Sequence, residues 1–139
     1  MAGPKKAVID TNLLVRYLTD DDPHKAKAVA DLLKSASRGE LKILVPSIAA
    51  AELVWVLESF YRLEPTVIAE LIEAVLNTPG VEVTEKSLIA NSLSLYKAGN
   101  MDFIDAWILS FAQYKNVKTV FTYDRKHFKN IEDVEITEP

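Results

Sequence analysis

Two acidic residues closely follow short apolar segments of the chain. Asp10 comes directly after the apolar residues 7–9, and Asp124 follows Val120-Phe121-Thr122 at the end of a second predicted strand. Short apolar runs of this kind are typical of buried strands. The carboxyl ends of parallel strands meet at one edge of a sheet, which is where open α/β sheets bind ligands. We therefore expect both carboxylates to lie at that edge.

Glu52 lies inside an apolar stretch, residues 48–57, that has the length of a helix. Burying a lone charge in such a segment is costly unless the charge is paired or binds a metal ion. A buried pair with Arg16 or Arg62 is the alternative explanation.

Asp102 and Asp105 are three residues apart in another predicted helix, so their side chains share one face of it.

Several of the acids also have ordinary explanations. Asp10 and Asp102 are well placed to cap the helices that follow them, and Asp124 could belong to a turn. Asp105 is harder to explain, because the positions four residues away from it hold no basic partner.

All five acids are harder to explain together than separately. Carboxylates that converge repel one another and raise each other's pKa, and a bound divalent cation removes this repulsion. The chain has no cysteine and only two histidines. Oxygen ligands of this kind favour Mg²⁺ or Mn²⁺ over softer metals.

The pattern of apolar residues predicts strands that alternate with helices. This alternation is typical of an α/β domain with a parallel sheet covered by helices on both faces. Ser47 is expected to cap its helix. The predicted strands are 7–9, 41–45, 81–83, 117–121 and 134–136, and the predicted helices are 12–18, 23–38, 47–61, 65–76, 87–98 and 102–114.

Length and composition fit one domain, residues 1–139, with an ordinary core. No apolar run approaches the roughly 20 residues of a membrane helix, and residues 1–6 are too short and polar for a secretory signal. The absence of cysteine suits a cytoplasmic protein. The net charge of −4 is unusual for a protein that holds nucleic acid through a basic surface.

Four segments in series resemble the motifs of PIN-domain nucleases, and most closely the VapC toxins of prokaryotic toxin–antitoxin pairs. The resemblance covers nearly the whole chain. The segments are Val8-Ile9-Asp10-Thr11-Asn12, Ala51-Glu52-Leu53, Asp102-Phe103-Ile104-Asp105-Ala106 and Thr122-Tyr123-Asp124-Arg125-Lys126-His127-Phe128.

The resemblance implies a PIN-like three-layer sandwich with a four- or five-stranded parallel sheet. It also implies a ribonuclease that binds one or two Mg²⁺ or Mn²⁺ ions, forms a homodimer and is blocked by a small cognate antitoxin. The catalytic acids that it implies are Asp10, Glu52, Asp105 and Asp124. Asp102 matches a further metal ligand, and Thr11, Asn12 and Thr122 match residues that support the site.

Basic residues near the motifs offer contacts to RNA phosphates. Arg16, Arg125 and Lys126 are the candidates, with Arg125 preferred because it adjoins Asp124. Solvated surface charge is the ordinary alternative for each of them, and His127 is expected to be structural or exposed.

Five aromatic residues recur at helical spacing, and we expect most of them to lie in the core. Some are candidates for a dimer interface or a groove for a partner helix. They are Trp55, Phe60, Tyr61, Trp107 and Phe111.

Two other functions are alternatives to a metal-dependent ribonuclease. A phosphatase of the haloacid-dehalogenase kind needs a second aspartate two residues after the first, and that position is Asn12. A PIN-like module that only binds RNA or protein would be marked by the loss of site acids, whereas all of them are present.

Overall fold

The computed structural model describes residues 3–99, 101–124, 128 and 133–139. The chain divides into two compact units, Met1–Lys86 and Ser87–Pro139, and each unit is described by itself.

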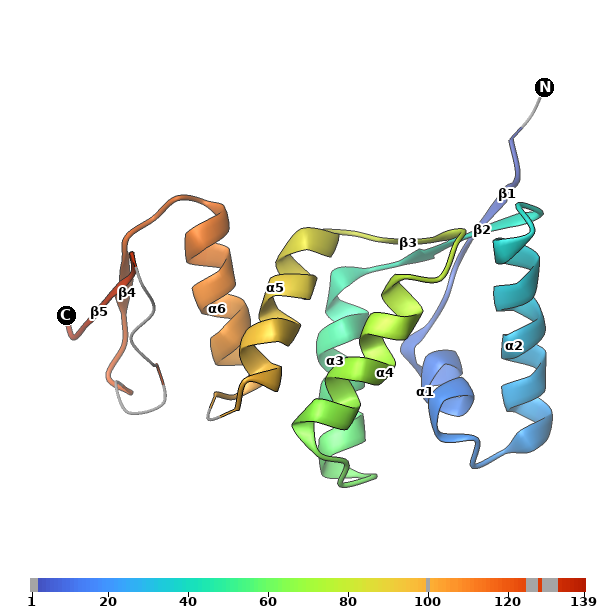
Figure 1. Cartoon of the computed structure of the whole chain (residues 1–139), viewed down its shortest axis with the longest axis horizontal. Coiled ribbons are helices and arrows are strands. Elements are labelled where there is room, and N and C mark those ends of the chain that lie inside the picture. Colours follow the sequence, from blue (N-terminus) through green and yellow to red (C-terminus); the bar gives the residue numbers. More distant parts are fainter. Residues whose placement is uncertain (1–2, 100, 125–127, 129–132) are drawn as a thin grey trace. The chain divides into compact units, whose positions relative to one another are not determined.

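The first unit is built on a three-stranded parallel sheet (Figure 1). Strand β2 (Leu41–Val45) lies between β1 (Lys5–Val8) and β3 (Val81–Val83). The register pairs Val8 with Leu44 and Val45 with Val83, so the three strands end close to one level. Strand β1 is more exposed than predicted, because it forms the edge of the sheet. Val8 is 70% exposed and Ile9 is 5% exposed.

Four helices pack around this sheet: α1 (Thr11–Thr19), α2 (Pro23–Ser37), α3 (Ser47–Ser59) and α4 (Pro65–Leu76). Helix α1 contacts α2 and α3, α2 packs on β2, and α4 packs on α3 and β3. The buried side chains of the unit form an aliphatic core. They include Leu14, Val29, Leu33, Ile43, Leu53, Leu57, Ile68 and Ile72.

The starts of two helices show how local sequence positions the elements. Asp22 caps α2 as predicted, and its carboxylate accepts a hydrogen bond of 3.2 Å from the backbone N–H of Lys25. The predicted cap at Ser47 is wrong. Pro46 holds the cap position, and the Ser47 hydroxyl instead contacts the carboxylate of Glu85 at 3.0 Å.

The second unit contains α5 (Lys86–Lys97), which begins at the boundary, α6 (Phe103–Tyr114), β4 (Thr119–Phe121) and β5 (Glu135–Thr137). Strands β4 and β5 form a parallel pair. The side chain of Asn91 on α5 donates hydrogen bonds to Ser110 and Gln113 on α6. The rings of Tyr96 and Phe103 meet edge to face at 5.9 Å.

The predicted α/β class with parallel strands is confirmed, but the predicted four- or five-stranded sheet is not. All five predicted strands occur within a residue or two of their expected bounds. In the part of the chain that the structure describes, they form a sheet of three strands in the first unit and a parallel pair in the second. Among the described residues, no helix is long and apolar enough to cross a membrane.

The expectation that most of the five aromatic residues lie in the core is wrong. Phe60 is 77% exposed, Trp55 66% and Phe111 40%, while Tyr61 and Trp107 are half-buried. Aliphatic side chains on the opposite face of α3 fill the core in place of Trp55. They are Ala49, Ala50, Leu53, Val54 and Leu57.

Two glycines with positive φ provide a test of the packing in the first unit. Gly39 (φ 80°) and Gly80 (φ 82°) have the same left-handed conformation, which strains any residue that carries a Cβ. A Cβ at Gly39 would meet nothing within 4 Å, whereas a Cβ at Gly80 would lie 2.2 Å from the carbonyl oxygen of Ala36.

Gly80→Ala is therefore expected to destabilise the fold more than Gly39→Ala. The conformational penalty alone is about 1–2 kcal/mol, and the clash with the backbone of α2 should add roughly 1–3 kcal/mol at Gly80. Urea unfolding followed by circular dichroism measures both variants. Equal losses would show that α2 and the start of β3 are not packed as described.

Candidate functional site

Asp10 lies where the chain leaves β1 and enters α1. It holds the N-cap position of α1, and its carbonyl oxygen accepts a 3.1 Å hydrogen bond from the N–H of Leu13. Its side chain makes no capping hydrogen bond and is exposed. The ordinary explanation, a helix cap, is therefore absent, and the carboxylate is available for another role.

Glu52 projects from the second turn of α3, the helix that follows β2. It is exposed, so the expectation of a buried charge is wrong. The alternative pair with Arg16 is not formed either, because Arg16 contacts Asp21. Within the described part of the chain, neither Asp10 nor Glu52 has a hydrogen bond or ion pair through its side chain.

The second unit holds the three other predicted acids. Asp102 occupies the N-cap of α6, again with no capping bond from its side chain. Asp105 lies in the first turn of α6, where the helix dipole favours a negative charge. Asp124 is exposed, and its backbone N–H donates a 3.0 Å hydrogen bond to the hydroxyl of Thr122. Thr122 thus orders the turn that carries Asp124.

The predicted acids divide between the two units, with two in the first and three in the second. Neither unit by itself, within the residues described, gathers three or more histidine, aspartate or glutamate side chains around one point. The convergence of four or five acids therefore stays a prediction.

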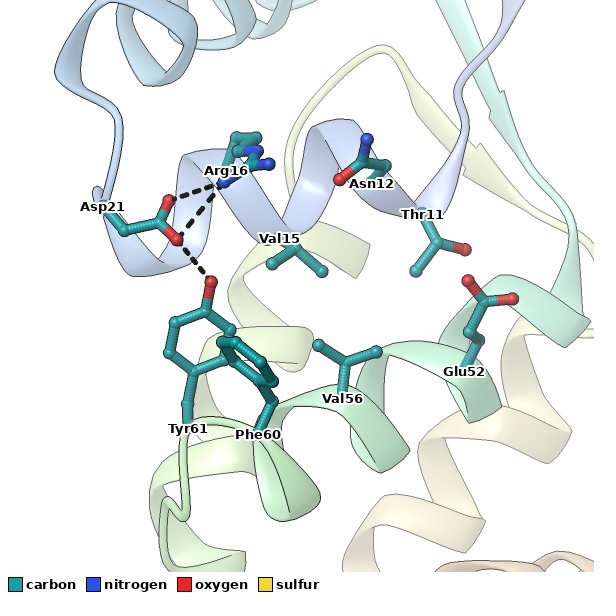
Figure 2. A pocket seen from close by; sticks show the side chains of 9 residues that line it. All are labelled: Thr11, Asn12, Val15, Arg16, Asp21, Glu52, Val56, Phe60 and Tyr61. Carbon is teal, nitrogen blue, oxygen red and sulfur yellow. Dashed lines mark hydrogen bonds and ion pairs between the residues drawn. The ribbon is translucent and has the colours of Figure 1, made fainter.

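The first unit does contain a pocket that joins several of the predicted residues (Figure 2). Its volume is about 410 Å³, and it lies along α1 and α3, within the range of about 300–1,000 Å³ that is usual for ligand sites. Figure 2 shows Thr11 and Glu52 at one end, Val15 and Val56 between, and an aromatic and charged group at the other end. The lining residues are Thr11, Asn12, Val15, Arg16, Asp21, Glu52, Val56, Phe60 and Tyr61.

The far end of this pocket is held by a network centred on Asp21. Nη1 of Arg16 donates to both oxygens of the Asp21 carboxylate at 3.3 Å, and the Tyr61 hydroxyl donates to Oδ2 at 2.5 Å. These contacts, with the Tyr61 hydrogen bond first and the Arg16 guanidinium after it, lower the pKa of Asp21. Phe60 packs against Tyr61 edge to face at 5.1 Å.

Sequence reasoning missed Asp21, and it placed Tyr61 only in a group of five aromatic residues of which most were expected in the core. A signal was available, because residues 20–22 are three consecutive aspartates and only Asp22 was needed as a helix cap. Asp20 ends α1 in a left-handed conformation (φ 53°), which leaves Asp21 to face the pocket.

The structure describes some of the predicted supporting residues and predicted RNA contacts but not others. Thr11 is buried at the start of α1 and lines the pocket with Asn12 and Arg16. Arg125, Lys126 and His127 lie outside the described residues.

Comparisons with known proteins identify the family of the chain. The family model described as "PIN domain" matches residues 7–134. A VapC ribonuclease of Aquifex aeolicus (strain VF5) is 27% identical over 122 residues, which cover 88% of this chain and 90% of that protein.

Tyr61→Phe is expected to raise the pKa of Asp21 toward its ordinary value, because the Tyr61 hydroxyl is the largest cause of its lowering. A lowered pKa contributes stability above the unfolded-state pKa and loses it as the pH falls through the folded-state pKa. The variant should therefore lose part of this stability at neutral pH, and its stability should fall less as the pH is lowered. Carboxyl NMR titration measures the change, with Tyr114→Phe as the control. An Asp21 titration identical in all three proteins would contradict the network.

Proposed function

Because the chain belongs to the PIN domain family, as its motifs predicted, we propose that it is a Mg²⁺- or Mn²⁺-dependent endoribonuclease that hydrolyses RNA phosphodiester bonds. The observation that carries this proposal is the state of Asp10 and Glu52. Both carboxylates are exposed, neither caps a helix, and neither pairs with a cation among the described residues. Two carboxylates that form no hydrogen bond or ion pair among the described residues are available to bind a cation.

The chemistry of the donors fits a hard divalent cation. Asp10 and Glu52 offer only carboxylate oxygens, which suit Mg²⁺ or Mn²⁺. We propose that Asp102, Asp105 and Asp124 of the second unit complete the ligand set around one or two ions. A divalent ion bound there neutralises the phosphate and makes water a stronger nucleophile at neutral pH.

The remaining residues of the proposed site position this acidic set. Thr11 and Asn12 support the acids of the first unit, and Thr122 holds the turn before Asp124. Arg16, Arg125 and Lys126 contact the RNA, and the two basic residues after Asp124 supply positive charge for its phosphates despite the net charge of −4.

The proposed protein partners are based on the similarity to the VapC ribonuclease and not on the geometry of the site. The match covers 90% of the VapC ribonuclease, so the similarity extends over nearly the whole length of that protein. We propose that this chain acts as the toxin of a toxin–antitoxin pair in the cytoplasm, as a homodimer that a small cognate antitoxin blocks.

Asp10→Asn should abolish cleavage without changing the fold, because its side chain forms no hydrogen bond or ion pair among the described residues. Loss of an outer-shell partner of a metal typically costs about 10–100-fold, so loss of a direct ligand should lower the rate at least about 100-fold. Mapping of new ends on total RNA measures cleavage. Asp31→Asn is the matched control, since Asp31 pairs with Lys27 on the surface of α2. Full activity of Asp10→Asn would refute the assignment.

Metal binding is tested separately by isothermal titration with Mn²⁺. The unaltered chain should release heat that saturates at one or two ions, and Asp10→Asn should lose most of it. Chelation with EDTA should stop cleavage, and added Mg²⁺ or Mn²⁺ should restore it. Equal heats for both proteins would favour the alternative, a PIN-like module that binds RNA or protein without cutting it.

A further inference from the structure

The pocket in the first unit runs from the proposed metal ligand Glu52 to an aromatic side chain, Phe60, for which the fold has no evident use. Phe60 is 77% exposed although it is one of the largest apolar residues in the chain. It follows the last residue of α3, and its ring lines the pocket. An exposed ring in a pocket beside a proposed phosphodiester site is a surface on which a nucleic-acid base can stack.

The ring of Phe60 is held in place by its neighbours. Tyr61 packs against it edge to face at 5.1 Å with an angle of 64° between the rings. Tyr61 is fixed in turn by the hydrogen bond from its hydroxyl to Asp21, which Arg16 also contacts (Figure 2). A platform that is ordered before the ligand arrives reduces the entropic cost of binding.

The charge at this end of the pocket favours a base over a phosphate. The guanidinium of Arg16 is balanced by the carboxylate of Asp21, so the end carries no net positive charge for a phosphate. A nucleobase is neutral and offers both hydrogen-bond acceptors and, in cytosine, adenine and guanine, an exocyclic amine. Asp21 can accept from such an amine.

Arg16 retains unused donors for the acceptors of a base. Its hydrogen bonds in the described structure are made by Nη1, and Nε is buried without an acceptor among the described residues. Nη2 makes no hydrogen bond among the described residues, so it can donate to a base acceptor while Nη1 stays on Asp21.

We infer that this pocket holds one unpaired nucleobase of the RNA, next to the phosphate that is cleaved. The base stacks on Phe60, and its polar edge faces Asp21 and Arg16, while Val15 and Val56 form the apolar wall between this base and Glu52. The inference rests on the proposed function and deepens it. The substrate must be single-stranded at this position, and bases with an exocyclic amine are preferred over uracil.

The test measures binding apart from cleavage. Fluorescence anisotropy follows fluorescein-labelled heptacytidylate and heptauridylate on the Asp10→Asn chain with Mg²⁺ present. Adding Phe60→Leu, which keeps an apolar side chain but removes the ring, should weaken heptacytidylate binding roughly 5- to 150-fold. Phe60→Trp should retain binding. Trp55→Ala is the matched control, because Trp55 is an exposed aromatic on α3 that does not line the pocket.

Base choice provides the second readout. The Asp10→Asn chain should bind heptacytidylate more tightly than heptauridylate, and Asp21→Asn should reduce this difference. Equal binding by the Phe60→Leu, Phe60→Trp and Trp55→Ala proteins would overturn the base pocket, as would heptauridylate binding at least as tight as that of heptacytidylate. If the unaltered chain cuts RNA in that case, the proposed function survives. If it cuts none while Phe60→Leu still weakens binding, the pocket survives and the proposed hydrolysis does not.

Discussion

Parallel pairing of β1 and β3 on either side of β2 is the constraint on which the candidate site depends. The pairing aligns the carboxyl ends of the strands, and the chain turns into α1 and α3 just beyond two of these ends. Asp10 occupies the first of these turns, and Glu52 follows one and a half helical turns after the second. Helices α1 and α3 then pack together, which forms the pocket between Asn12 and Phe60. The register of the backbone therefore determines which side chains can share a ligand.

Electrostatics explains how an acidic chain could act on a polyanion. A basic surface would bind RNA of any sequence through its phosphates, and this chain, with a net charge of −4, does not have that composition. Carboxylates that bind a cation can attract one phosphate at one point. An aromatic pocket can add affinity that does not depend on charge, and such contacts would also limit binding to unpaired RNA. The bound cation and the aromatic pocket would hold the RNA at two points, in place of a basic surface that attracts RNA everywhere.

Local signals in the sequence predicted most elements, whereas long-range arrangement could not be predicted. Asp22 and Pro23 marked the start of α2, Pro65 marked α4, and the apolar segment 41–45 was recognised as β2. The grouping of the strands into a sheet of three and a pair depends on tertiary packing, which the spacing of apolar residues does not show. The exposure of Phe60 was missed for a related reason, because helical spacing shows which residues share a face but not whether another element covers it. Asp10 and Glu52 were identified as candidates by position, and the network of Asp21 with Tyr61 joins residues 40 positions apart.

The central proposal is that Asp10, Glu52, Asp105 and Asp124 bind one divalent cation site. Diffraction from crystals soaked in Mn²⁺, with data collected at the manganese absorption edge, tests this claim most directly. The account predicts an anomalous peak within coordination distance, about 2.0–2.3 Å, of oxygens from Asp10 and from at least one of Asp105 and Asp124. Carboxylates of Asp10, Glu52, Asp105 and Asp124 on separate surfaces, with no anomalous peak beside Asp10, would contradict it.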